Sequence, residues 1–255
     1  MSEQLPPTVT EIDRLNRTTF DALASEYNDS MRLTTANFHD LSRGFFERHV
    51  YDAADQDFAL LDLGAGTGFV SSLLSHAKGL VLAIDISFQM LVHALVPDNI
   101  QRHKICGSAF ALPLGNATVG RIVSSLASSF LRAEALKEVS RVLRPEGLFI
   151  FSMPSKAWTD TIRGLGDLEK TTFVSRAGFS SVAFSFTYTQ NEMSQLLDKY
   201  EFDVLESTVS RGISLRNYDR SVSPTLVEAA KQNRLPLDEM PILELYACRK
   251  RVGGG

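Results

Sequence analysis

The residues best suited to chemistry are three closely spaced glycines behind a short apolar run. Residues 58–63 read Phe-Ala-Leu-Leu-Asp-Leu, and Gly64, Gly66 and Gly68 follow closely. A glycine turn between a strand and a helix lets the backbone approach a ligand closely, and the N–H groups at the start of the helix suit an anionic group. The spacing therefore predicts a ligand-binding turn at the end of this strand.

A carboxylate stands at the end of the next apolar run. Residues 80–84 read Leu-Val-Leu-Ala-Ile, and Asp85 follows them. A carboxylate in that place can accept two hydrogen bonds from ribose hydroxyls, so the glycine turn and Asp85 together predict a cofactor of adenosine type. A dinucleotide fingerprint needs a glycine where Phe69 stands. A nicotinamide oxidoreductase is therefore disfavoured, although it stays an alternative.

The elements that must position these residues alternate between buried strands and amphipathic helices. Helices are expected at 87–95, 133–143 and 190–200 from their apolar spacing. Strands are expected at 58–63, 80–84, 102–106, 121–126, 148–153, 202–207 and 242–249. This rhythm predicts an α/β fold with a Rossmann-like, doubly wound, mostly parallel seven-stranded sheet.

Further segments surround this sheet. Residues 1–56 contain two stretches of helical apolar spacing and are expected to form an N-terminal helical lid. Residues 57–255 are expected to form the core of what is overall a single domain, with cap insertions at about 154–187 and 210–240 on the substrate side. Within the first insertion, residues 182–188 alternate in the manner of one strand.

Composition narrows the classes of function. The 255 residues carry 26 Lys and Arg against 30 Asp and Glu, a net charge of −4 that disfavours nucleic acid as a partner. Cys106 and Cys248 are far apart in sequence, so no metal site or disulfide is expected and a cytoplasmic location is favoured. No apolar stretch approaches the roughly 18 residues of a membrane span.

Four motifs, in this order along the chain, resemble those of a known family. They read Leu61-Asp-Leu-Gly-Ala-Gly-Thr-Gly68, Asp85-Ile-Ser with Met90-Leu91, Ala111-Leu-Pro113, and Arg141-Val-Leu-Arg-Pro-Glu-Gly147. These motifs are similar to those of the class I S-adenosylmethionine-dependent methyltransferases of small-molecule type, which include the quinone-biosynthesis C-methyltransferases.

The resemblance implies S-adenosylmethionine as the cofactor and assigns residues to its parts. The methionine part would lie against Gly64, Ala65 and Gly66, the ribose on Asp85, and the adenine beside Ile86. The other residues expected at the cofactor are Met90, Ser108, Ala109, Phe110, Leu126 and Tyr27, the last as a lid residue in the pattern Ala24-Ser-Glu-Tyr27.

The resemblance further implies methyl transfer to a small-molecule acceptor, at oxygen, nitrogen or carbon, by in-line displacement. A neutral amine acceptor needs no strong base, whereas a hydroxyl or carbon acceptor must lose a proton, for which Tyr27 and His39 are the candidates. Ser108 and Arg121 each stand where the family commonly has an aspartate. They motivate an alternative, a scaffold that binds S-adenosylmethionine without methyl transfer, as a cyclisation-type enzyme or a binding subunit.

Overall fold

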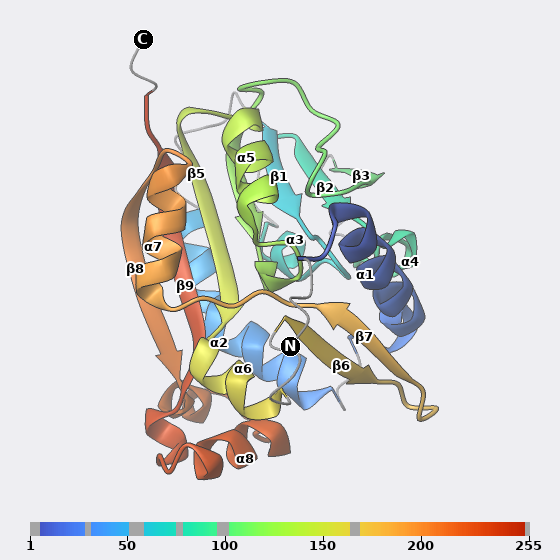
Figure 1. Cartoon of the computed structure of the whole chain (residues 1–255), viewed down its shortest axis with the longest axis vertical. Helices are drawn as coiled ribbons and strands as arrows, with labels where there is room; N and C mark the ends of the chain where they lie inside the picture. Colours follow the sequence, from blue (N-terminus) through green and yellow to red (C-terminus); the bar gives the residue numbers. More distant parts are fainter. Residues whose placement is uncertain are drawn as a thin grey trace.

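Seven strands form one sheet at the centre of the computed structural model, in the order β3-β2-β1-β4-β5-β9-β8 (Figure 1). The structure describes residues 6–28, 32–50, 59–74, 79–95, 102–163 and 169–252. The seven strands are β1 Ala59–Leu63, β2 Val81–Asp85, β3 Arg102–Cys106, β4 Val119–Ser124, β5 Leu143–Pro154, β8 Phe202–Arg211 and β9 Pro241–Lys250. β3, β2, β1, β4 and β5 run parallel, and β9 is antiparallel to both of its neighbours. The expected mostly parallel sheet is confirmed.

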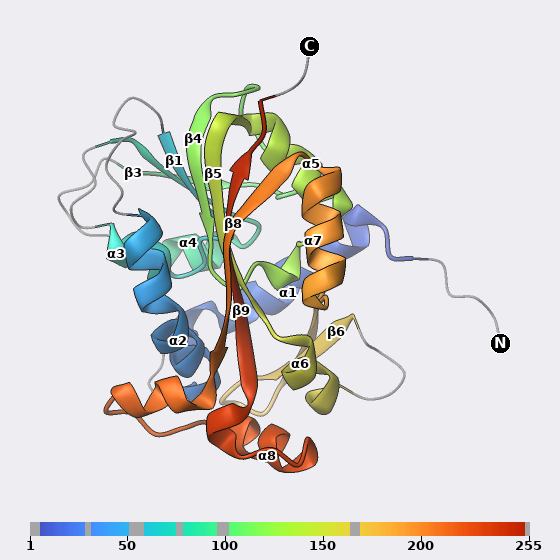
Figure 2. The same cartoon turned by 90° about the vertical axis from the view of Figure 1, so that its left-hand side faces the viewer.

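Helices cover both faces of this sheet. They are α1 Val9–Leu23, α2 Leu33–Val50, α3 Phe69–Leu73, α4 Phe88–Val92, α5 Ala133–Val142, α6 Lys156–Ile162, α7 Gln190–Lys199 and α8 Pro224–Gln232. Alternate side chains of β5 show how the faces are filled, since Phe149 and Phe151 pack with α5 and α7 whereas Ile150 packs with α2 and α3. Figure 2 shows these two pairs of helices on opposite sides of the sheet. The doubly wound arrangement is thus confirmed.

The order of the strands reverses between β1 and β4. These two strands pair in parallel although β2 and β3 separate them in sequence. In an open parallel sheet, ligands bind outside the carboxyl ends of the strands at such a reversal. The glycine turn follows β1, so the fold places it at this position.

Several expected element boundaries differ in the structure: β4 spans 119–124 rather than 121–126, and β8 extends to Arg211 rather than to 207. β5 begins at Leu143 rather than Leu148, because Leu143 already pairs with Val119 before the register shifts. α4 is shorter than the expected 87–95, because the N–H of Leu95 leaves the helix and donates to the carbonyl of Thr67 in the glycine turn. The expected strand start at Phe58 and the boundary between 56 and 57 lie outside the described residues.

The two N-terminal helices lie in different places. Ile12 of α1 packs against Phe184 and Phe186, beyond the carboxyl ends of the strands, whereas Phe45 and Phe46 of α2 join the core on the α3 face. A short 3-10 helix, η1 (Ala24–Glu26), ends α1. The segment that was expected to form a lid therefore also supplies part of the core.

The first insertion contains two strands where one was expected. After α6, the strands β6 (Lys170–Val174) and β7 (Ser180–Phe184) form a separate antiparallel sheet of two strands. The expected strand over 182–188 was wrong at both ends. β7 stops at Phe184 because the next two N–H groups donate to Glu169 and Ser128, outside the β6–β7 ladder. The second insertion folds into α8 between two 3-10 helices, η3 (Gly212–Asn217) and η4 (Leu237–Glu239), at the lower end of the molecule (Figure 1).

Arg121 supports the fold rather than the site. It is buried in β4, and its Nη1 donates to the carbonyls of His49 at 2.8 Å and Val50 at 3.0 Å, at the carboxyl end of α2. We expect Arg121→Met to lower the free energy of unfolding by about 1–3 kcal/mol, because two helix carbonyls lose a charged donor. Urea denaturation would measure this change. Arg48→Met, at an exposed arginine of α2, serves as the control and should change stability by less than about 0.5 kcal/mol; equal losses would contradict this role.

Candidate active site

The glycine turn after β1 is built for close approach rather than for donating hydrogen bonds. Gly64, Gly66 and Gly68 have φ angles of +67°, +51° and +92°, which favour glycine, and a Cβ on Gly68 would lie 2.7 Å from the carbonyl oxygen of Leu95. The N–H groups of Gly64 and Ala65 both donate to Ile84. These two N–H groups are therefore used within the fold, whereas the expectation from the sequence concerned the N–H groups at the start of the following helix, α3.

Asp85 joins the turn after β1 to the start of α4. One carboxylate oxygen accepts the N–H of Gly66 and the other accepts the N–H of Ser87, both at 2.8 Å. Burial raises the pKa of Asp85 to about 6, although the two N–H donors oppose this rise. The carboxylate is thus held in a fixed orientation beside the cavity and keeps lone pairs for a ligand.

A cavity at the carboxyl ends of β1, β2 and β4 brings most of the predicted cofactor residues together. Those that line it are Tyr27, Gly64, Asp85, Ile86, Met90, Ala109, Phe110 and Leu126. Ala65 lines a smaller cavity next to it, together with Tyr27, Gly64 and Leu126. Gly66 is linked to the site through Asp85. Ser108 is not among the lining residues, and its hydroxyl accepts the N–H of Phe110 at 3.1 Å.

Three residues of α1 that were not expected at the site also line this cavity. Asp13, Asn16 and Phe20 lie on the face of α1 that covers it. The side-chain amide of Asn16 donates to the carbonyl of Ser129 and accepts the N–H of Phe184, both at 2.7 Å. From the sequence alone, polar residues on an amphipathic helix are expected to face solvent. Whether Asp13 and Asn16 line a cavity depends on the segments against which the helix packs, and the sequence does not show these.

The smaller cavity contains the two candidate catalytic residues. Burial, with a contribution from Asp85, raises the pKa of Tyr27 to about 12, so its hydroxyl stays protonated at neutral pH. His39 stacks on Phe69 with ring centroids 3.9 Å apart. Burial, with nearby Arg43, lowers the pKa of His39 to about 4, which leaves the imidazole neutral and weakly basic. Tyr27 is thus a hydrogen-bond donor, and His39 is a neutral wall of this cavity.

Asp62 lies beneath the same cavity, at the end of β1. Its carboxylate accepts a hydrogen bond from the hydroxyl of Ser71 and contacts Nη2 of Arg102 at 3.2 Å. Burial raises the pKa of Asp62 to about 6 against these two contacts. This buried network ties β1 to α3 and to β3, and so supports the turn from below.

A much larger cavity, of about 650 Å³, opens beyond Tyr27. Its aromatic walls come from α1, α2, α6 and the β6–β7 hairpin, as Phe20, Phe38, Trp158, Phe173 and Phe184. Hydroxyl groups of Thr34, Ser223 and Thr225 line the end next to α8. The mixture of rings and hydroxyls suits an organic molecule with an apolar body and a few polar atoms.

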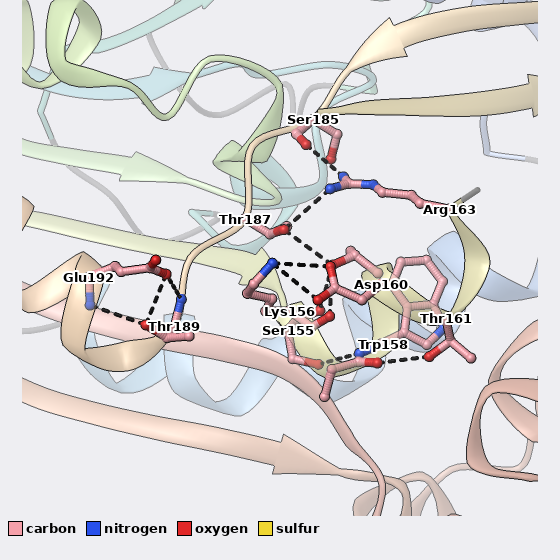
Figure 3. A network of polar contacts seen from close by, with 12 residues as sticks. Ser155, Lys156, Trp158, Asp160, Thr161, Arg163, Ser185, Thr187, Thr189 and Glu192 are labelled. Atoms are coloured by element: carbon pink, nitrogen blue, oxygen red, sulfur yellow. Dashed lines mark hydrogen bonds and ion pairs between the residues drawn. The ribbon is translucent and has the colours of Figure 1, made fainter. Parts of the chain in front are cut away.

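Contacts of α6 hold one wall of this large cavity in place (Figure 3). Nη2 of Arg163 donates to the carbonyl of Ser185 at 2.6 Å, and Nη1 donates to the hydroxyl of Thr187 at 3.3 Å. At the other end of α6, the hydroxyl of Ser155 accepts the N–H of Trp158 at 3.2 Å. The contacts of Arg163 join α6 to the chain that leaves the β6–β7 hairpin, whereas Ser155 caps the first turn of α6.

Charged groups lie at the outer part of the large cavity. The Glu26 carboxylate contacts the Arg32 guanidinium and accepts the N–H of Arg176 at 3.0 Å, and these hydrogen bonds lower its pKa. Arg32 also donates to the carbonyl of Val174 at 3.2 Å. These contacts connect the segment after α1 to the tip of the hairpin.

No helix within the described ranges is long and apolar enough to cross a membrane. The same ranges also contain no group of three or more His, Cys, Asp or Glu side chains placed to hold a metal ion.

The chain is similar to known methyltransferases. A family described as a methyltransferase domain matches residues 61–151. The chain is 29% identical over 198 residues to the ubiquinone/menaquinone biosynthesis C-methyltransferase UbiE of Rubrivivax gelatinosus, over 75% of this chain and 76% of the relative. It is 33% identical over 106 residues to the malonyl-[acyl-carrier protein] O-methyltransferase of a Methylovorus species, but this match spans 37% of the chain and 36% of that relative.

A solved structure is similar over nearly the whole length. The [4+2]-cyclase SpnF matches with a TM-score of 0.62 and 14% identity, over 97% of this chain and 98% of that chain, which shows a common fold. The two methyltransferases named above have names that refer to different substrates, and the family match of this chain is to a methyltransferase domain. Residues 61–151 therefore form a domain of the class I S-adenosylmethionine-dependent methyltransferases.

Proposed function

We propose that the protein transfers the methyl group of S-adenosylmethionine, by in-line displacement, to a small molecule held in the large cavity. The observation that carries this proposal is that Tyr27 and Leu126 line all three cavities. The cofactor side and the large cavity therefore meet at one place. S-adenosylmethionine supplies a methyl group that is already activated by its sulfonium sulfur, so positioning and exclusion of water are the main tasks left to the protein.

The cavity at the carboxyl ends of β1, β2 and β4 is the one that we assign to the cofactor, and we call it the cofactor cavity. Its residues fit S-adenosylmethionine. We assign Gly64, Ala65 and Gly66 to its methionine part and Asp85 to the ribose hydroxyls. Ser125 lines both the cofactor cavity and the smaller cavity next to it. Its buried hydroxyl has no hydrogen-bond partner within the described residues, so it is available to a ligand. The adenine would lie between the apolar side chains of Ile86, Met90, Ala109 and Phe110, with Ser108 at their edge.

The large cavity favours acceptors that need no strong protein base. Among the described residues that line it, the carboxylate of Glu26 is engaged by Arg32 and Arg176, and no histidine or lysine is present. Tyr27 keeps its proton, and so we assign it to orienting the acceptor or the cofactor by donating a hydrogen bond. A neutral amine, or an acidic hydroxyl that ionises by itself, fits this environment.

The residues that line the cavities also support the lid and cap roles of the segments around the sheet. Residues of 1–56 line all three cavities, and both proposed insertions, about 154–187 and 210–240, contribute to the large one. We therefore retain 1–56 as the lid and 57–255 as the core with two caps. The acceptor would contact mainly the lid and the caps, whereas the cofactor contacts the ends of the sheet strands.

A second candidate is a cyclisation-type reaction without methyl transfer. The similarity to the [4+2]-cyclase SpnF favours it, because that protein has the same fold over almost the whole chain. A cavity of about 650 Å³ with aromatic walls would also suit folding a flexible polyene for ring closure. The two candidates differ in whether a methyl group leaves the cofactor.

Asp85 gives the first test of the cofactor site. We expect Asp85→Asn to weaken binding of S-adenosylhomocysteine by about 10- to 100-fold, because one amide N–H would face the N–H of Gly66 or Ser87 and a charged acceptor for the ribose is lost. In the unchanged protein the affinity should fall as the pH drops below about 6, since the carboxylate becomes protonated. Titration calorimetry across pH 5 to 8 measures both effects. Asp203→Asn, on the distant edge strand β8, is the control and should keep both the affinity and its pH dependence.

Tyr27 and His39 are tested by methyl transfer itself. With isotopically labelled methyl on S-adenosylmethionine and a small-molecule extract, mass spectrometry should reveal a labelled product. Tyr27→Phe should lower the rate of its formation by about tenfold, the cost of one well-placed hydrogen bond, while binding of S-adenosylhomocysteine is kept. His39→Gln should have a smaller effect, because His39 lines the smaller cavity and not the large one. Release of a cyclised, unlabelled product would instead support the second candidate.

A further inference from the structure

A second carboxylate lies in the cofactor cavity, and it comes from the lid. Asp13 of α1 lines this cavity at the end where Ala109 and Phe110 follow β3. Its side chain lies beside that of Ser108, and Arg17 on the same helix lies near it. Partial burial nevertheless raises the pKa of Asp13. Within the described residues, Asp13 and Asp85 are the carboxylates of this cavity.

We propose that Asp13 accepts a hydrogen bond from the amino group of the cofactor's adenine ring, so that the N-terminal helix α1 takes part in recognising the base. This inference rests on the cofactor site proposed above. It adds a residue that is distant in sequence from the four motifs and that belongs to a helix outside the sheet.

The order of the strands places the adenine at Asp13. Asp85 ends β2, which lies between β1 and β3 in the sheet. The ribose is the middle part of the cofactor, so a ribose at β2 leaves one end of the molecule near β1 and the other near β3. The β1 end has the glycine turn and Tyr27, whereas the β3 end has the apolar side chains of Ala109 and Phe110. A flat aromatic ring fits the apolar β3 end, where Asp13 lies.

The chemistry of adenine explains why a carboxylate suits this place. The amino group is the one hydrogen-bond donor on the ring of adenosine, and a buried carboxylate is a strong acceptor that gains from further donors. The other polar groups nearby are already used. Asn16 is bonded at both ends of its amide, and the Ser108 hydroxyl accepts the N–H of Phe110. Asp13, with several lone pairs and the Ser108 contact, has acceptor capacity left.

The same helix reaches the large cavity. Thr19 donates to the carbonyl of Val182 at 2.7 Å, and Asn16 accepts the N–H of Phe184, so α1 is fixed to β7. Phe20, on the following turn, lines both the cofactor cavity and the large cavity. A hydrogen bond between the adenine and Asp13 therefore acts on an element that also forms a wall around the acceptor.

The test compares two ligands on two proteins. Titration calorimetry would use S-adenosylhomocysteine and its analogue with purine in place of adenine, which lacks only the amino group. The unchanged protein should bind the analogue about 10- to 100-fold more weakly. Asp13→Ala should bind S-adenosylhomocysteine about as weakly as the unchanged protein binds the analogue, and it should no longer distinguish the two ligands. Equal discrimination by both proteins would overturn the proposal.

Controls separate this result from misfolding and from failure of the proposed function. Glu11→Ala removes an exposed carboxylate from the same helix and should keep both the affinity and the discrimination. Asp13→Asn keeps one acceptor oxygen, so it should show an intermediate loss. Hydrogen exchange should show α1 still protected in Asp13→Ala, because the contacts of Asn16 and Thr19 remain. If the unchanged protein binds neither ligand, the proposed cofactor site itself fails.

Discussion

The site depends first on one carboxylate that accepts two backbone hydrogen bonds. Asp85 binds the N–H of Gly66, after β1, and the N–H of Ser87, before α4. These bonds keep two loops from neighbouring strands at a fixed separation, and the cavity lies beside them. The carboxylate holds this position although burial raises its pKa to about 6, so the group that shapes the cavity also presents lone pairs to a ligand.

The parallel sheet and the segments added to it form different cavities of the site. The carboxyl ends of β1, β2 and β4 form the cavity that we propose for the cofactor, and these strands lie mostly within the residues that match the methyltransferase domain. The large cavity is enclosed mostly by α1, α2, α6 and the β6–β7 hairpin, outside the matched residues. The architecture thus allows one cofactor chemistry to be combined with different acceptors, because the enclosing elements can change without disturbing the strand ends.

The sequence predicts best the elements that are specified by local pattern. Local sequence patterns predicted all seven strands of the sheet, although residues 102–106 are largely polar, and the glycine turn and Asp85 indicated the edge of the sheet where a cavity lies. β6 was missed because Lys170-Thr-Thr-Phe-Val174 is short and half polar, and it becomes a strand by pairing with β7. Asp13 was missed for a similar reason. Nothing in α1 itself distinguishes Asp13 from a solvated carboxylate until the helix packs beside Ser108.

The contacts around the large cavity differ in kind from its interior to its entrance. Deep in its walls, Asn16 and Arg163 hold backbone groups through buried hydrogen bonds, which dissolved ions barely affect. At the hairpin tip, the partly exposed Glu26 and Arg32 form an ion pair, and each of them also binds a backbone group of the hairpin. Such a pair weakens as ionic strength rises. The rate at which an acceptor enters and leaves should therefore respond to salt, while the shape of the cavity that selects it should not.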